Sequence, residues 1–361
     1  MKIATKRAVT AATALLLAAG TLTACAPQED SSSDTGDAAT GKIALLLPES
    51  KNTRYEAYDR PLFEAKVAEL CPECEVIYSN ADQDPAKQQQ QAESALTQGV
   101  AVMVLDPVDS SAAASIVASA KAQDVPVISY DRLINSPDLA FYLSFDNEKV
   151  GELQGQAFVD KLAADGVTEG DVVMINGSPT DNNATLFKKG AHNVIDASDY
   201  NVVAEFDTPD WSPDKAQEWM AGQVTQFGDS IVGVYAANDG TAGGAIAAMK
   251  AGGVDPLPPV TGQDAELPAI QRIVSGDQFM TIYKALKLEA ETAAQLAIDL
   301  LNGKSLTGES ADTDGVPTTL LNPVVVTIDN IMDTVIADGF YTVEDICTAE
   351  YADACAAAGI Q

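Results

Sequence analysis

The sequence predicts an α/β fold in which doubly wound parallel β-sheets are covered by helices on both faces. Short apolar runs alternate with amphipathic stretches along most of the chain. The apolar runs carry few polar positions, as expected for parallel strands that are buried on both faces. Helix-start signals also open several amphipathic stretches, at Asp84 before Pro85, at Ser110, and at Ser212 before Pro213.

The N-terminal segment predicts export. Lys2, Lys6 and Arg7 precede the apolar run "AVTAATALLLAAGTL", and "LTAC" then ends at Cys25. These are the charged, apolar and cleavage regions of a secretory signal over residues 1–24. A cysteine after small residues at this point resembles a bacterial lipobox, which implies an acylated Cys25 that anchors the mature chain to the outer face of the cell membrane. An uncleaved membrane helix is the alternative, but the apolar run is short for a bilayer.

A flexible tether is expected next, over residues 25–41. The stretch "APQEDSSSDTGDAATG" has almost no large apolar side chain, so it cannot bury enough surface to offset its ordering entropy. We therefore place the start of the folded body near Lys42. The 320 residues that follow favour two domains over one.

The folded body alternates predicted strands with helical segments to about residue 284. The predicted strands are residues 42–47, 75–79, 100–105, 125–130, 140–145, 171–176, 201–206, 231–236, 258–262 and 279–283. Trp219 falls inside the helical stretch "PDKAQEWMAGQV" and is expected in the core.

The mature chain is strongly acidic. Without the three cations of the signal, 18 Lys and Arg face 53 Asp and Glu, a formal charge of −35. Such a surface repels nucleic acid and anionic lipid headgroups, so we expect no nucleic-acid partner and no membrane contact except the lipid. We also expect a monomer without a cofactor. His192 is the only histidine, which argues against zinc sites and Ser-His-Asp triads.

The remaining cysteines form two close pairs, Cys71 with Cys74 and Cys347 with Cys355. In an oxidising compartment we interpret them as two local disulfides, although four cysteines permit three pairings. A redox C-x-x-C would open a helix after a strand. "CPEC" instead follows a helical stretch and precedes a strand, which favours a structural disulfide.

Polar side chains follow nearly every predicted strand, at the edge where open parallel sheets bind ligands. We interpret Asp106, Asp146, Asp239 and Asn182 as helix caps. The candidate ligand-binding residues are Arg54, Tyr55, Asp131, Arg132, Asp181, Asn183, Trp211, Asn238, Asp264 and Lys284.

Arginine is the most informative residue type in this set. Only four arginines occur in the mature chain, and Arg54 and Arg132 both lie in strand-end loops. A guanidinium is a rigid fork of donors suited to two adjacent oxygens. The alternative for Arg132 is an ion pair with the neighbouring Asp131 that only braces the loop.

The charges of the candidate set cancel, which predicts a neutral ligand rich in hydroxyls. Three cations face three carboxylates, and Asn183 and Asn238 can donate or accept. A phosphate or dicarboxylate site would need a cationic surplus or a glycine-rich cradle, and "GTAGG" at 240–244 lacks the required spacing and position. The set therefore predicts a sugar site.

Aromatic side chains support this interpretation. Trp211 lies in the loop "DTPDWSP", where burial in a core is awkward, and a flat indole can cover the C–H face of a pyranose. Tyr55, beside Arg54, is a candidate for a second aromatic wall, with an exposed loop position as the alternative.

Seven motifs are similar to those of a known family. They are "YDRLIN", "FYLSFDNEKVGELQG", "GSPTDNNATLF", "AANDGTAGGAI", "GQDAELPAIQRI", "MTIYKALKLEAETAA" and "DGFYT". In order and spacing they resemble the D-xylose-binding proteins of the type I periplasmic sugar-binding family, over about residues 42–345. The resemblance implies that one monosaccharide is held by the candidate residues and delivered to the permease of an ABC importer. The first loop, "ESKNTRYEAYDRP", departs from the family by having Tyr55 where relatives often have Trp.

The resemblance also implies two similar lobes joined by a three-stranded hinge. The N-terminal lobe would comprise residues 42–146 and 285–320, and the C-terminal lobe residues 147–284 and 321–361. Sugar would bridge the two half-sites and favour the closed form.

Two rival functions use the same features. An exported glycosidase would need a carboxyl pair such as Asp131 and Asp264, but neighbouring cations favour the ionised form and suit a general acid poorly. A lipid-anchored sensor would present bound sugar to a receptor instead of a permease. Another aldose, such as glucose, is the alternative ligand.

Overall fold

The structure is a computed structural model, which describes residues 40–361 of the chain. The predicted signal peptide, the proposed acylation site at Cys25 and nearly all of the predicted tether lie outside the described residues. Within the described range, no helix has the length and apolar character needed to cross a membrane.

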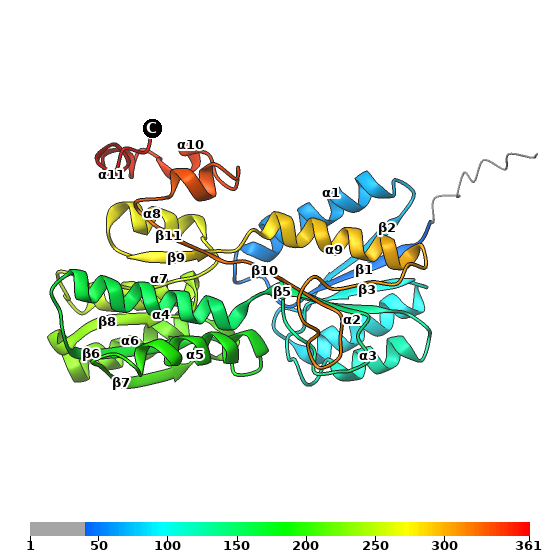
Figure 1. Ribbon diagram of the computed structural model, residues 1–361, viewed down its shortest axis with the longest axis horizontal. Helices are drawn as coiled ribbons and strands as arrows, with labels where there is room; N and C mark the ends of the chain where they lie inside the picture. The colour runs from blue at the N-terminus through cyan, green and yellow to red at the C-terminus, as the bar shows by residue number, and fades with distance from the viewer. Residues whose placement is uncertain (1–39) are drawn as a thin grey trace, which may run out of the picture. The chain divides into compact units, whose positions relative to one another are not determined.

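A six-stranded parallel sheet forms one part of the fold (Figure 1). Its strand order is β10-β5-β4-β3-β1-β2, so β10, the last of these six strands along the chain, occupies an edge. Every neighbouring pair in this sheet runs parallel. The strands are β1 (Lys42–Leu47), β2 (Glu75–Asn80), β3 (Val102–Leu105), β4 (Val127–Tyr130), β5 (Phe141–Phe145) and β10 (Thr318–Leu321).

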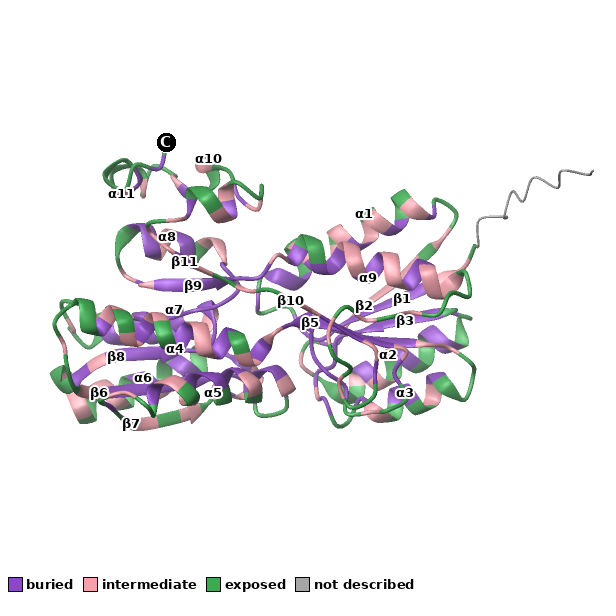
Figure 2. Cartoon of the chain, in the orientation of Figure 1, coloured by how far each residue is buried: buried purple, intermediate pink, exposed green. Residues whose placement is uncertain are grey.

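Helices cover both faces of this sheet because successive strand residues point in opposite directions. Ile43 and Leu45 of β1 pack into one apolar cluster with Phe63, whereas Ala44 and Leu46 pack into another with Ala92. Figure 2 shows β1, β3, β4 and β5 as mainly buried, whereas the edge strand β2 is mostly half-buried and the helices have exposed outer faces. The helical elements around this sheet are η1 (Tyr55–Asp59), α1 (Arg60–Leu70), α2 (Pro85–Thr97), α3 (Ala114–Lys121) and α9 (Leu286–Leu301).

A three-stranded parallel sheet, in the order β7-β6-β8, forms a second doubly wound layer. Val172 and Met174 of β6 face one apolar cluster, and Val173 and Ile175 face another. Its elements are α4 (Asn147–Ala164), β6 (Gly170–Asn176), α5 (Asn182–Ile195), β7 (Tyr200–Asp207), η2 (Pro209–Trp211), α6 (Pro213–Phe227), η3 (Gly228–Ser230), β8 (Ile231–Ala236) and α7 (Asp239–Ala251).

A small antiparallel pair, β9 with β11, and the C-terminal helices complete the fold. They share one apolar cluster that includes Tyr283, Val326 and Ile346. The chain passes between the six-stranded sheet and the remaining elements three times, after β5, after β9 and after β10. The elements not yet named are α8 (Leu267–Ser275), β9 (Met280–Tyr283), β11 (Val324–Thr327), η4 (Met332–Ile336), α10 (Val343–Ile346) and α11 (Ala352–Ala357).

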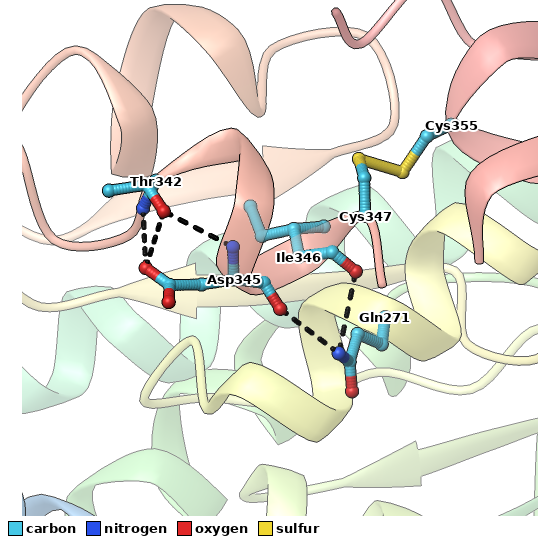
Figure 3. Close-up of a disulfide and its surroundings, with 6 residues drawn as sticks. All are labelled: Gln271, Thr342, Asp345, Ile346, Cys347 and Cys355. Atoms are coloured by element: carbon cyan, nitrogen blue, oxygen red, sulfur yellow. Dashed lines mark hydrogen bonds between the residues drawn. A yellow bond between two sulfur atoms is a disulfide. The ribbon is translucent and has the colours of Figure 1, made fainter. Parts of the chain in front are cut away.

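Both predicted disulfides are confirmed. Cys71 bonds to Cys74 between α1 and β2. Cys347 bonds to Cys355 and closes the turn between α10 and α11 (Figure 3). The Gln271 side chain of α8 donates hydrogen bonds to the Asp345 and Ile346 carbonyls, at 3.3 and 3.4 Å, and so ties this disulfide-bonded segment to α8.

The predicted fold class is correct, but several element predictions are wrong. Residues 258–262 form no strand and contribute only a bridge between Val260 and Val234, because Pro258 and Pro259 cannot donate backbone hydrogen bonds. Strands β10 and β11 were not predicted. Each is only four residues long, although the Val and Thr residues of "TTLL" and "VVVT" favour strands.

The predicted helix caps are correct in part. The carboxylate of Asp84 caps α2, Asp146 caps α4 and Ser212 caps α6. Ser110 is not a cap, because α3 begins later, at Ala114. The Ser110 hydroxyl instead accepts a hydrogen bond from the Asn182 amide at 3.2 Å.

The other three predicted caps are also wrong. Asp181 and Asn238, rather than their neighbours Asn182 and Asp239, cap α5 and α7. Asp106 forms a buried ion pair and caps no helix.

Candidate functional site

One cavity brings together all ten residues that the sequence nominated. The space between the lining side chains measures about 270 Å³, including the part open to solvent. Asn52, Phe187 and Gln263 also line it and were not predicted. The nominated residues are Arg54, Tyr55, Asp131, Arg132, Asp181, Asn183, Trp211, Asn238, Asp264 and Lys284, and each is at most 6% exposed.

The cavity lies at strand ends, because the carboxyl ends of parallel strands meet at one edge of a sheet. Asp131 and Arg132 follow β4, and Lys284 follows β9 directly. Asp181 and Asn238 each stand at the first turn of a helix, where their side chains also accept backbone N–H bonds at 2.8 and 2.9 Å. Capping and cavity lining are therefore combined in the same two residues.

Arg54 is fixed by three carboxylates. Its Nε and Nη2 atoms each donate to one oxygen of Asp59 at 2.9 Å, and Nη2 also donates to Glu289 Oε2 at 2.9 Å. Its Nη1 atom lies 3.1 Å from Asp131 Oδ1. Burial opposes the charge of Arg54, but these carboxylates raise its pKa well above the ordinary value. The guanidinium is thus held charged and in one orientation.

Arg132 has a different set of partners. Its Nε atom lies 3.0 Å from Asp181 Oδ2 and 3.5 Å from Asp106 Oδ1. Its Nη2 atom donates to the Tyr55 hydroxyl at 2.9 Å, and Nη1 donates to a backbone carbonyl. No ion pair joins Arg132 to Asp131 within residues 40–361, so the loop-bracing pair considered from the sequence is not formed.

Asp131 lies between two cations from different parts of the chain. Besides Arg54, the Lys284 ammonium approaches its Oδ1 at 3.5 Å, and Lys284 also lies 3.3 Å from Asp264 Oδ1. Burial alone would raise the pKa of Asp131, but Arg54, Lys284 and Arg132 outweigh it and lower this pKa to about 2. Asp131 is therefore ionised at neutral pH.

The site carries more acid than the sequence indicated. Asp59, Asp106 and Glu289 are fully buried around the nominated cations. Burial raises the pKa of Asp106 and of Glu289 well above the ordinary range. The negative charges of these two carboxyl groups are therefore disfavoured. A signal for Glu289 existed, since it shares a helix face with the buried Leu286, Ala290 and Ala293.

Trp211 lines the cavity and is also buried, at 3% exposure, within an apolar cluster. Its Nε1 atom donates to Asp181 Oδ2 at 3.0 Å, and its ring meets the edge of Phe187 at 6.2 Å and 65°. Burial of this indole was therefore not awkward. Trp219, which was expected in the core, is half-buried and stacks on Phe206 at 5.4 Å.

Tyr55 is also a wall of the cavity and not an exposed loop residue. It is 2% exposed and begins the π-helical turn η1. The guanidinium carbons of Arg54 and Arg132 lie 5.2 and 5.8 Å from its ring centre, within cation–π range.

Two buried acceptor atoms at the cavity, Asn183 Oδ1 and Gln263 Oε1, have no partner among the described residues. Asp131 Oδ1 and Asp264 Oδ1 are held there by ion pairs with Arg54 and Lys284. Buried polar atoms are normally hydrogen-bonded, so the two amide oxygens fit a ligand that brings its own donors. Fixed cations beside unfilled acceptors can bind a molecule whose groups both donate and accept.

Three cavity residues adopt a left-handed backbone that is uncommon for side chains with a Cβ atom. The φ angles are 54° at Asp131, 53° at Trp211 and 93° at Asp264. Such conformations cost roughly 1–3 kcal/mol each and cluster at functional sites. Hydrogen bonds hold the last of these turns in place. The Ala265 amide donates to Thr281, and the Tyr341 hydroxyl donates to the Ala265 carbonyl.

Comparisons with known proteins identify related sequences. Residues 43–305 match the family described as periplasmic binding protein domain. The chain is 38% identical over 307 residues to the D-xylose-binding periplasmic protein of Escherichia coli K12, which covers 83% of this chain and 91% of that protein. The D-xylose-binding periplasmic protein of Haemophilus influenzae is 37% identical over 312 residues, or 84% of this chain and 92% of that protein.

A solved structure shows the same fold. The solute-binding protein of an ABC transporter from Clostridium phytofermentans, with bound β-D-glucose, superposes with a TM-score of 0.77 and 27% sequence identity. The match covers 84% of this chain and 99% of that chain.

Proposed function

The chain belongs to the type I periplasmic sugar-binding proteins, and on this premise we propose that it captures D-xylose and delivers it to the permease of an ABC importer. Members of this family bind solutes and do not transform them, so the chain is not an enzyme. The coarser assignment, a solute-binding protein for monosaccharides outside the cytoplasm, follows from the same relatives.

The observation that carries the sugar proposal is the pairing of buried cations with unfilled acceptors around one small cavity. Arg54, Arg132 and Lys284 supply fixed cations, while Asn183 and Gln263 each leave an amide oxygen without a partner among the described residues. A sugar hydroxyl donates and accepts at once, so a neutral polyol can use both. An anionic ligand would meet the surrounding carboxylates, and their repulsion would oppose binding.

D-xylose is preferred as the ligand because both curated relatives above are named for it and cover most of the chain. Glucose is the alternative, since a structure of the same fold holds β-D-glucose. The lining side chains are polar or aromatic, which suits a ring that carries hydroxyls at its rim and C–H groups on its faces.

The proposed mechanism is capture by closure of two lobes. We assign residues 42–146 with 285–320 to one lobe and residues 147–284 with 321–361 to the other. Hydrogen bonds already join the two sets across the cavity rim, from Asn238 to Asn52 at 3.2 Å and from the Thr53 amide to Glu266 at 3.1 Å. A sugar held by both sets stabilises the closed arrangement by its differential affinity.

The lipid anchor at Cys25 belongs to this proposal and rests on the lipobox-like "LTAC" alone. A lipid-anchored sensor would use the same closure but present the sugar to a receptor. Deleting the protein should abolish D-xylose uptake if it serves an importer, and uptake that persists would favour the sensor.

The carboxyl pair that a glycosidase would use, Asp131 with Asp264, suits that reaction poorly. A general acid must hold a proton near neutral pH, whereas the cations around Asp131 lower its pKa to about 2.

Calorimetric titration of the purified protein with D-xylose, D-glucose and D-xylonate tests the proposal directly. We expect D-xylose to bind most tightly and D-xylonate, in which C1 of the same carbon chain is oxidised to a carboxylate, to bind weakly or not at all. The absence of heat with any neutral monosaccharide at about millimolar concentration, near a free energy of −4 kcal/mol, would reject it.

A further inference from the structure

We propose that Gly177 is a positioning residue that sets the place of the Trp211 indole in the cavity. The effect on sugar affinity rests on the proposed function, whereas the effect on the indole does not. Gly177 directly follows β6 and is buried.

The clearance between the Gly177 backbone and the indole leaves no room for a side chain. A Cβ atom on Gly177 would lie 2.0 Å from Cη2, 2.1 Å from Cζ2 and 2.6 Å from Cζ3 of Trp211. Carbon atoms pack at roughly 3.5–4.0 Å. All three atoms belong to one rigid ring, so relief requires the whole indole to move by more than about 1 Å.

Steric room, and not backbone conformation, requires glycine here. Gly177 is absent from the described glycines with positive φ, so alanine is compatible with its backbone. The neighbouring Asp210 and Trp211 do adopt left-handed conformations, with φ of 58° and 53°, and this loop holds the indole against the β6 end.

Two other contacts define the indole position that Gly177 permits. Nε1 donates to Asp181 Oδ2 at 3.0 Å, and the ring packs on the edge of Phe187. Asp181 Oδ2 also lies 3.0 Å from Arg132 Nε. A displaced indole therefore loses its own hydrogen bond and disturbs the carboxylate that holds Arg132.

The test uses Trp219→Phe as the parent, because the chain has two tryptophans and Trp211 is then the only fluorophore of its kind. Trp219 does not line the cavity. Gly177→Ala should shift the emission maximum and acrylamide quenching of the ligand-free protein, and should weaken D-xylose binding by about tenfold or more in calorimetry. Unchanged emission together with unchanged affinity would overturn the proposal.

Gly233→Ala is the matched control. Its Cβ atom would lie 2.4 Å from Phe158 Cζ, a similar clash with a core ring that does not line the cavity. We expect this variant to lower thermal stability while leaving Trp211 emission and sugar affinity near the parent values. Equal losses of affinity in both glycine variants would assign Gly177 to general packing and overturn its positioning role.

A second arm removes the clashing atoms. Trp211→Phe removes the outer ring of the indole. Adding Gly177→Ala to this variant should therefore weaken sugar binding by less than about twofold further. A tenfold further loss would show that Gly177 acts by another route.

Folding and function failures remain distinguishable. If Gly177→Ala alone does not fold, recovery of folding in the double variant supports the steric relation, and failure of both overturns it. If the parent binds no sugar, the proposed function fails, and the emission of the ligand-free variants still decides this inference.

Discussion

At the residue scale, the cavity depends on side chains that serve two purposes. Asp181 caps α5 while it holds Arg132 and the Trp211 indole. Asn238 caps α7 while it bonds to Asn52. Because each side chain is held by its own helix, its second contact at the cavity is made from an already ordered position.

Asp131→Asn should weaken D-xylose binding by about 1–3 kcal/mol, since a charge-assisted acceptor becomes a neutral amide between two cations. Calorimetric titration at pH 7 measures the loss. Asp353→Asn, at an exposed position of α11, is the control and should bind like the wild type. Equal affinity of the two variants would leave Asp131 a structural role only.

The ion-pair partners of the buried acids cannot be predicted from residue type alone. Asp59 and Glu289 bind Arg54 from positions 5 and 235 residues away in the chain. No local pattern relates a carboxylate in η1 to one in α9. Asp59 and Glu289 both reach Arg54 because α9 packs against η1 and α1.

At the scale of elements, the C-terminal segment supports the cavity from outside. Tyr58 of η1 stacks on Phe340 at 4.4 Å between ring centres, and Tyr341 bonds to the carbonyl that follows Asp264. The Cys347–Cys355 disulfide closes the end of this segment beside α8 (Figure 3).

Replacing Cys347 and Cys355 together by serine should lower the free energy of unfolding by about 2–3 kcal/mol, because the disulfide removes loop-closure entropy from the unfolded chain. The pair Cys71 and Cys74 closes a separation of 3 residues instead of 8, so its double serine variant should lose less. Denaturant unfolding of the two variants compares them. A larger loss for the Cys71 and Cys74 variant would show that packing, and not loop length, dominates.

At the scale of the whole molecule, the burial of Glu266 couples folding to pH. Glu266 accepts the Thr53 amide and is surrounded by Asp264, Arg272 and Glu49. Burial and the nearby Asp264 raise the pKa of Glu266 to about 7. The folded chain therefore binds an additional proton between the ordinary Glu pKa of 4.5 and pH 7, and the stability from this group is lost as the pH rises through that window.

Glu266→Gln should consequently gain stability relative to the wild type as the pH rises from 4.5 to 8, by about 1–3 kcal/mol in total. Thermal unfolding at several pH values measures this difference. Glu218→Gln, at an exposed position of α6, should show no such trend. Parallel stability curves for Glu266→Gln and the wild type would contradict the elevated pKa.

The sequence by itself determined the fold class, both disulfides and the ten nominated residues that line the cavity. These follow from local information, because apolar runs, close cysteine pairs and strand-end polar residues each act over a few positions. The strands β10 and β11 were not predicted because four residues are too few to show a period, and their pairing with β5 and β9 is with partners remote in the chain.

Only the tertiary structure decided which charges meet. Arg132 pairs with Asp181 and Asp106 instead of its neighbour Asp131, and Arg54 binds Asp59 and Glu289. The clearance between Gly177 and the Trp211 indole likewise depends on two segments that are remote in sequence. Such relations depend on how packed elements bring distant residues together, and burial then sets the strength of each contact.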